Sequence, residues 1–213
     1  MRICINNATK YIKSALILDH VNLELESGKI YGLQGPNGSG KTMLMRLIAG
    51  LIRPTQGEVG IDQKLLGKEF DFPPSMGLMI EDPAFLPNYT GKKNLELLAS
   101  IRHRISVLEI EKSLFDVGLQ PDDSRKYKKY SLGMKKRLGI AAAIMEKPEL
   151  ILLDEPTNAL DDEGVEQICQ LMMRERDRGA LIVIACHDAT ILDRVADEVY
   201  VVNEGRVQTK VHP

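Results

Sequence analysis

The chain has 213 residues, enough for one large domain or a core domain with a small insert. Its net charge of −2 gives no overall basic field of the kind that attracts nucleic acid or an acidic membrane surface. The longest apolar runs, LGIAAAIM and ALIVIAC, fall well short of the roughly 20 residues that a membrane-spanning helix needs. We therefore expect a globular chain that does not cross a bilayer.

The cysteines and the N-terminus indicate the compartment. Cys4, Cys169 and Cys186 are scattered, lack metal-ligand spacing and lie in apolar segments, as expected for small buried side chains. The first residues, MRICINNATKY, lack the apolar core and cleavage site of a signal peptide. These features predict a reducing, cytoplasmic location.

Strand and helix patterns alternate along most of the chain. Strand-like runs are predicted at residues 1–8, 15–26, 29–35, 58–62, 76–81, 149–156, 180–187, 198–205 and 206–211. Helical periodicity covers residues 42–51, 92–102, 106–117, 132–145 and 161–178. The runs at 149–156 and 180–187 are continuously apolar, which is typical of parallel strands buried on both faces. The alternation indicates an α/β fold.

Residues 87–145 differ from the rest. They contain helices with charged faces, a turn at LQPDDS and no convincing strand. No repeat, low-complexity tract or flexible linker interrupts the chain. We therefore predict one domain over residues 1–213, with an α/β core of residues 1–86 and 146–213 and an inserted helical subdomain of residues 87–145.

A glycine-rich segment matches the phosphate-loop pattern G-x-x-x-x-G-K-[ST]. It comprises Gly35, Pro36, Asn37, Gly38, Ser39, Gly40, Lys41 and Thr42, and we call it the phosphate loop. An apolar strand leads in and a helix leads out, so backbone amides and the helix N-terminus can surround phosphate oxygens. Lys41 would serve the terminal phosphates and Thr42 would ligate Mg²⁺. The alternative is a glycine-rich turn with a coincidental Lys-Thr pair.

Two carboxylates follow a buried strand. Asp154 and Glu155 end ELILLDEP, at the edge where parallel α/β sheets bind ligands. Asp154 could hold Mg²⁺, and Glu155 could act as the general base on the attacking water. On their own, the two acids could equally be solvated caps of the next helix. The upstream phosphate loop favours the catalytic interpretation.

Further motifs resemble the ATP-binding-cassette (ABC) ATPase family. YSLGM at residues 130–134 resembles the signature motif L-S-G-G-Q, with Ser131 and Gly133 matching. NALD at 158–161 resembles the D-loop, and His187 in ACHD resembles the switch histidine. Tyr11 stands where the family often carries an adenine-stacking aromatic residue. The resemblance covers the whole chain and implies a P-loop (RecA-like) core with an N-terminal antiparallel β subdomain.

The resemblance implies ATP and Mg²⁺ as cofactors and two cassettes that enclose two ATP molecules. Ser131 and Gly133 would bind the γ-phosphate held by the other protomer, while His187 would contact the γ-phosphate and orient the attacking water. Asp161 would bridge the protomers. Each residue also has a structural alternative: a helix cap for Ser131 and Asp161, a hydrogen-bonded strand end for His187, and packing for Tyr11.

Outside the signature motif, the sequence departs from the family pattern at two further positions. Glu81 replaces the usual glutamine that senses Mg²⁺ and the membrane partner. A carboxylate can still bind metal, but it cannot donate hydrogen bonds while ionised. Met43 follows Thr42 where a second hydroxyl is common, so one nucleotide contact is missing. Neither change removes Lys41, Asp154, Glu155 or His187, so we expect hydrolysis.

The resemblance is to cassettes whose permease is a separate polypeptide, particularly those of bacterial bacitracin-type and lantibiotic-type exporters. It implies an integral membrane permease and a second cassette as partners, with the chain peripheral on the inner face of the cell membrane. The permease would dock near residues 81–95, where Phe85, Leu86 and Tyr89 offer apolar contact.

Two other functions stay open on the sequence. One is a soluble ABC ATPase acting on nucleic acid or the ribosome, supported by the basic run RKYKKY and by Lys135, Lys136 and Arg137. The balanced net charge and single cassette weigh against it, and no nucleic acid partner is expected. The other is a nucleotide-binding regulator without turnover, which would require a defective general base.

Overall fold

The computed structural model describes residues 1–210. The strands are β1 (Arg2–Ile12), β2 (Ala15–Glu26), β3 (Ile30–Gln34), β4 (Gln56–Ile61), β5 (Lys64–Leu65), β6 (Met76–Met79), β7 (Leu150–Asp154), β8 (Leu181–Cys186), β9 (Glu198–Asn203) and β10 (Arg206–Thr209). The helices are α1 (Lys41–Ile48), α2 (Gly91–Arg102), α3 (Val107–Asp116), α4 (Leu132–Ile144), α5 (Asp162–Asp177) and α6 (Ala189–Val195), with a 3₁₀ turn at Tyr127–Lys129.

The apolar strands form the centre of a mixed sheet with the order β10-β9-β3-β8-β7-β6. All neighbours are parallel except β10, which pairs antiparallel with β9. Successive residues of β7 enter different cores: Leu150 and Leu152 face one, and Ile151 and Leu153 the other. This alternation explains the continuously apolar sequence. Because β3, β6, β7 and β8 are parallel, their carboxyl ends lie at one edge of the sheet.

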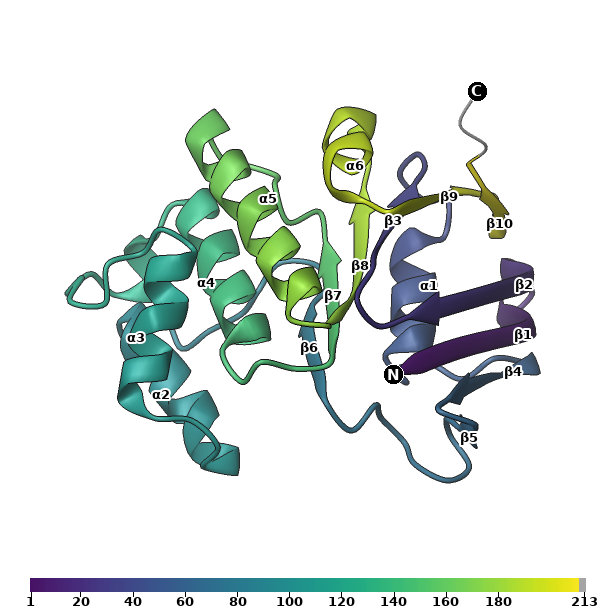
Figure 1. Cartoon of the computed structure of the whole chain (residues 1–213), viewed down its shortest axis with the longest axis horizontal. Coiled ribbons are helices and arrows are strands. Elements are labelled where there is room, and N and C mark those ends of the chain that lie inside the picture. The colour runs from purple at the N-terminus through teal and green to yellow at the C-terminus, as the bar shows by residue number, and fades with distance from the viewer. Residues whose placement is uncertain (211–213) are drawn as a thin grey trace.

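The N-terminal strands form a second, antiparallel sheet with the order β2-β1-β4-β5. Helix α1 lies between the two sheets, as Figure 1 shows. Its buried residues Leu44, Met45, Leu47 and Ile48 join one core with residues of both sheets. The phosphate loop, which precedes α1, is thereby fixed between the sheets.

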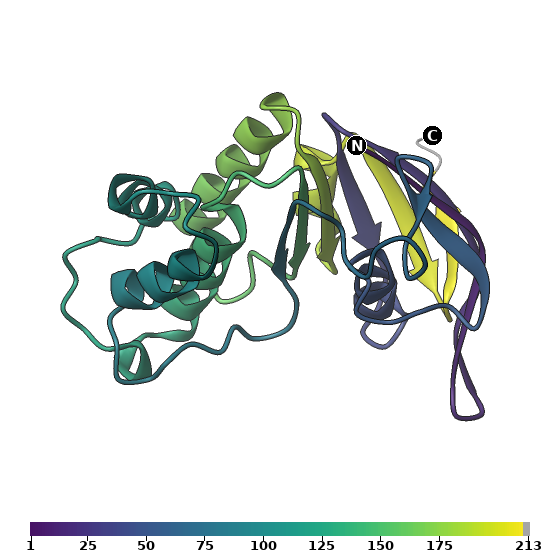
Figure 2. The ribbon, with the colours of Figure 1, turned by 90° about the horizontal axis from the view of Figure 1, so that it is seen from below.

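Helices α2, α3 and α4 lie between β6 and β7 in the sequence and at the opposite end of the molecule from the antiparallel sheet (Figures 1 and 2). Their buried side chains share a core with α5, α6 and the second face of the mixed sheet. Thr90, Ser106 and Ser131 cap the N-termini of α2, α3 and α4, each accepting a backbone amide hydrogen. In the described residues, no helix is long and apolar enough to cross a membrane.

The expected architecture is confirmed: a mixed parallel sheet with helices, an N-terminal antiparallel sheet and inserted helices. Several boundaries were wrong. The first strand continues past residue 8 to Ile12, because a bulge at Asn7, with φ 49°, carries it through the polar segment. The strand expected at 76–81 ends at Met79, and Glu81 adopts φ 62°. Residue 211, in the last expected strand, lies outside the described residues.

Candidate nucleotide-binding site

The phosphate loop leads from β3 into α1 and leaves the start of this helix uncapped. Gly40, the N-cap residue, has φ 113°, a conformation that side-chain-bearing residues rarely adopt. Within residues 1–210, no side chain caps the start of α1, whereas the N-cap side chains of α2, α3, α4 and α5 each accept a backbone amide hydrogen. Because the first amides of a helix have no intrahelical acceptor, this end can receive an anion.

Two side chains of the phosphate loop also lack partners that a bound anion could supply. Lys41 is 6% exposed, and its Nζ donates to the carbonyl oxygens of Gly35 (2.6 Å) and Pro36 (3.0 Å). It forms no ion pair with a carboxylate of residues 1–210. Ser39 Oγ is buried and has no hydrogen-bond partner in the same range. A buried ammonium group without a counter-charge and an orphaned hydroxyl both fit a phosphate chain.

Thr42 and Asp154 meet at the edge of the mixed sheet. The Thr42 hydroxyl donates to Asp154 Oδ2 at 2.8 Å, and Asp154 is buried. Within residues 1–210 there is no cluster of three His, Cys, Asp or Glu side chains that could hold a metal by themselves. One carboxylate and one hydroxyl are what Mg²⁺ uses when nucleotide phosphates and water supply its other ligands. The donor set therefore fits Mg²⁺ bound together with nucleotide.

Glu155 and His187 form a second pair at this edge. His187 Nδ1 lies 2.8 Å from Glu155 Oε2, and the Glu155 side chain is 17% exposed. Glu155 has φ 47°, an unusual backbone conformation for this residue type, and its amide donates to the Ala185 carbonyl at 2.8 Å. These contacts fix the carboxylate directly after Asp154. A carboxylate held in this way can accept a proton, and the imidazole beside it can donate or accept a hydrogen bond.

The signature residues form a separate group. Ser131 caps α4 by accepting from the Met134 amide, and Gly133 packs so closely on the D-loop that a Cβ would lie 2.6 Å from the Ala159 carbonyl oxygen. Asp161 caps α5 and accepts from Arg137 Nη2 at 3.3 Å. Among the described residues, the hydrogen bonds of Ser131 and Asp161 do not reach the phosphate loop. The structure thus divides the predicted site residues into two groups.

Tyr11 and Glu81 lie at the margins of the phosphate-loop group. Tyr11 is exposed and pairs with Leu16, the neighbour of Ile17, whose carbonyl oxygen packs beside Gly40. This places Tyr11 near the start of α1. Glu81 Oε1 accepts from Arg46 Nη2 at 2.6 Å and not from Thr42. Sequence reasoning missed Arg46, although its position one helical turn after Thr42 placed it on the same face of α1.

Comparisons with known proteins show the family to which the chain belongs. The family model described as "ABC transporter" matches residues 18–158. The chain belongs to the ABC transporter family. It is 45% identical over 203 residues to the uncharacterized ABC transporter ATP-binding protein YybJ of Bacillus subtilis (strain 168), covering 95% of this chain and 93% of YybJ. It is 39% identical to the bacitracin transport ATP-binding protein BcrA of Enterococcus faecalis, covering 97% of this chain and 68% of BcrA.

Solved structures support the same assignment. The dimeric bacterial ABC transporter cassette MJ0796 superposes with a TM-score of 0.86 at 27% identity, covering 97% of this chain and 96% of that one. A dimeric post-hydrolysis state of MJ0796, bound to ADP and Pi, has a TM-score of 0.86 at 26% identity and covers 98% and 97% of the two chains. This ABC chain is therefore an ATPase cassette, the ATP-binding subunit of a transporter.

Proposed function

We propose that this cassette hydrolyses ATP with Mg²⁺ and drives a separate membrane permease. The main support for this proposal is the arrangement of Lys41, Thr42 and Asp154 at one sheet edge, next to the Glu155–His187 pair. In this proposal the loop amides of residues 35–43 and Lys41 hold the phosphates, and Tyr11 stacks on adenine. Met43 contributes its backbone amide and no second hydroxyl.

Mg²⁺ would be held by Thr42 and Asp154 together with phosphate oxygens, and Glu81 is the third predicted ligand. Bound Mg²⁺ would neutralise charge on the phosphates. Glu155 would accept the proton of the attacking water as general base. His187, whose Nδ1 contacts Glu155, would present its other ring nitrogen to the γ-phosphate side of the site. The non-hydrolysing alternative is disfavoured because neither the base nor its imidazole partner is missing.

A second cassette would complete the site. Ser131, Gly133 and Asp161 belong to a group that does not reach the phosphate loop of its own chain, so their predicted phosphate and bridging roles require a second chain. The dimeric MJ0796 cassettes are consistent with such an arrangement. We further propose the division predicted above, in which residues 87–145 act as one helical unit that carries the signature towards the partner's nucleotide.

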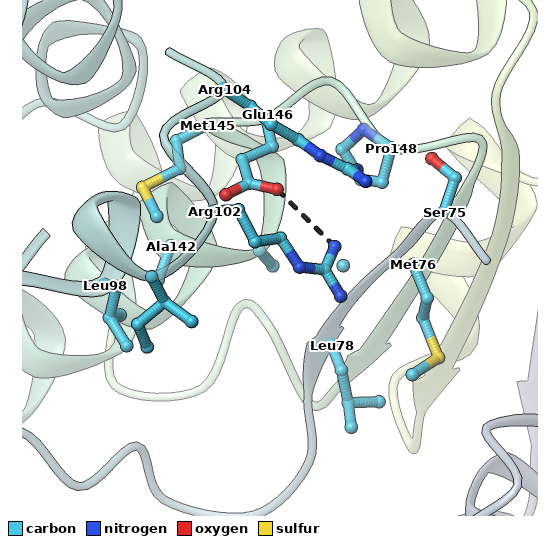
Figure 3. A pocket seen from close by; sticks show the side chains of 13 residues that line it. Ser75, Met76, Leu78, Leu98, Arg102, Arg104, Ala142, Met145, Glu146 and Pro148 are labelled. Atoms are coloured by element: carbon cyan, nitrogen blue, oxygen red, sulfur yellow. Dashed lines mark ion pairs between the residues drawn. The ribbon is translucent and has the colours of Figure 1, made fainter. Parts of the chain in front are cut away.

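The permease would dock in a groove beside α2, α4 and β6. One cavity of about 420 Å³ reaches Glu81 and Phe85, and a second of about 220 Å³ adjoins it through shared lining residues. Figure 3 shows the second cavity, where Arg102 and Glu146 form an ion pair of 3.6 Å. Leu86 and Tyr89 are exposed, whereas the Phe85 ring packs edge-on against Tyr127. Apolar walls with a few charges suit a short amphipathic helix.

Peptide antibiotics are the proposed cargo class, with export as the direction. This rests on relatives: the bacitracin transport protein BcrA, and the lantibiotic transport ATP-binding protein SrtF of Streptococcus pyogenes, which is 33% identical over 95% of this chain and 87% of SrtF. Docking on a permease would place the cassette at the cytoplasmic face of the cell membrane.

The nucleic acid alternative loses part of its support in the structure. Tyr127 and Tyr130, which interleave the basic run, are buried, and their hydroxyls bond to the Pro83 carbonyl and the Gly91 amide. Arg125 is paired with Asp123 at 2.8 Å. Buried rings cannot stack on bases, so this segment would offer charge alone.

Two experiments test the proposal. Glu155→Gln should bind ATP without hydrolysing it and form a dimer, seen as a doubled mass in size-exclusion chromatography with light scattering. A monomer at saturating ATP would contradict an ATP-driven dimer of this chain alone.

Purification of the tagged protein from detergent-solubilised native cells, followed by mass spectrometry, should recover a stoichiometric integral membrane protein. Recovery of ribosomal proteins or nucleic acid that survives moderate salt would instead support the alternative.

A further inference from the structure

Outside the signature motif, both positions at which this chain departs from the family pattern, Met43 and Glu81, contact Arg46. Arg46 Nη2 donates to Glu81 Oε1 at 2.6 Å, and Arg46 Nη1 lies 3.9 Å from Met43 Sδ. Arg46 extends from α1, and Glu81 follows β6. The guanidinium group of Arg46 therefore links the first turn of α1 to the segment that follows β6.

This contact lies next to the metal-binding pair. Thr42 and Arg46 are four residues apart on α1, so their backbones are separated by about 6 Å along the axis. Strands β6 and β7 are parallel neighbours, with Met79 opposite Leu153. In this register Glu81 follows β6 at the same edge at which Asp154 ends β7. Two bonds from one helix face, Thr42 to Asp154 and Arg46 to Glu81, thus reach carboxylates at the ends of two adjacent strands.

The backbone of Glu81 also has a contact from α4. Lys136 on α4 is 6% exposed, and its Nζ lies 3.4 Å from the Glu81 carbonyl oxygen and 3.5 Å from Asp82 Oδ1. The backbone of Glu81 is fixed at φ 62°. With the backbone held, rotation of the Glu81 side chain decides whether its carboxylate faces Arg46 or the metal.

We propose that Arg46 is a positioning residue that holds the Glu81 carboxylate as an ion pair and competes with the nucleotide-bound metal ion for it. A neutral glutamine has no need of such a counter-ion, whereas an unpaired carboxylate beside Asp154 would repel it. The inference rests on the proposed nucleotide and metal site and adds the control of one of its predicted ligands.

Binding of Mn²⁺, used as a paramagnetic probe in place of Mg²⁺, tests the competition. Free Mn²⁺ is counted by electron paramagnetic resonance with ATP present, in a Glu155→Gln background that preserves the nucleotide. Arg46→Met should tighten Mn²⁺ binding by about five-fold, the upper range for a partly exposed ion pair. The change should be smaller than about 1.5-fold when Glu81→Gln is also present, because no carboxylate is then released.

Matched variants separate this effect from a general loss of positive charge. Arg46→Lys should keep the affinity close to that of the parent, and Arg46→Gln should repeat the effect of methionine. Arg53→Met removes another half of an exposed ion pair, with Asp71, and should change nothing. The inference would be overturned if Arg46→Met tightened Mn²⁺ binding equally with Glu81 and with Glu81→Gln. It would also be overturned if Arg46→Met did not tighten Mn²⁺ binding at all. A parent that binds ATP weakly or fails to bind Mn²⁺ would instead overturn the proposed function.

Discussion

Lys41 carries a positive charge that no carboxylate of the described residues 1–210 neutralises by an ion pair. Its Nζ contacts the carbonyl oxygens of Gly35 and Pro36, which in the nucleotide-bound state would compete poorly with phosphate oxygens. Lys41→Ala should weaken ATP binding by roughly ten- to hundred-fold, the range for loss of a charge-assisted hydrogen bond. Titration with a fluorescent ATP analogue measures the change. Lys64→Ala, an exposed lysine on β5, is the control, and equal affinities of the two variants would refute a phosphate role for Lys41.

At the scale of single residues, the sequence predicted site residues as one group where they belong to recognised motifs. Lys41, Thr42 and Asp154 were predicted as one site because parallel strands end at a common edge, and the Thr42–Asp154 hydrogen bond agrees with that expectation. The Arg46–Glu81 ion pair was not predictable, because 35 residues separate its partners and no motif links them. Such contacts depend on the register between α1 and β6, which the sequence pattern leaves undetermined.

The close packing of α4 against β6 requires that Gly77 has no side chain. A Cβ at Gly77 would lie 1.8 Å from the Ala143 carbonyl oxygen and 2.9 Å from Pro148, so helix and strand would have to separate. Gly77→Ala should destabilise the protein by about 1–3 kcal/mol through overpacking, lowering the thermal midpoint by about 2–4 °C per kcal/mol. Gly60→Ala is the control, because the nearest atom to its Cβ would be 3.7 Å away. Equal midpoints for the two variants would contradict this close approach.

Element prediction succeeded where periodicity or capping was strong. The apolar runs became β7 and β8, and Ser106 and Asp161 cap α3 and α5 as helix-start residues do. Helix α6 and the two-residue strand β5 were missed, because elements of seven and two residues contain too few periods to stand out. Tertiary contacts stabilise such short elements more than local preference does.

At the scale of the whole molecule, burial of ionisable side chains makes the free energy of unfolding decrease as the pH becomes alkaline. Burial is the largest cause of the raised pKa values of Cys169, Cys186, Tyr31, Tyr127, Tyr130 and Tyr200. These groups lie in the two cores on either side of the mixed sheet, so deprotonating them opposes the packing of both halves of the molecule. We therefore expect the fold to lose stability above the ordinary pKa range of these groups.

Cys186, which ends β8 beside His187, provides the sharpest test. Burial raises the pKa of its thiol from the ordinary 9.0 to about 11. The folded state therefore keeps the proton while the unfolded state releases it, so this stabilisation is complete below pH 9 and is lost as the pH rises from 9 to about 11. Urea unfolding across this range should show a slope that is less steep in Cys186→Ala, by up to about 1.4 kcal/mol per pH unit. A Cys186→Ala slope equal to the parent's would show that the Cys186 thiol titrates alike in the folded and unfolded states.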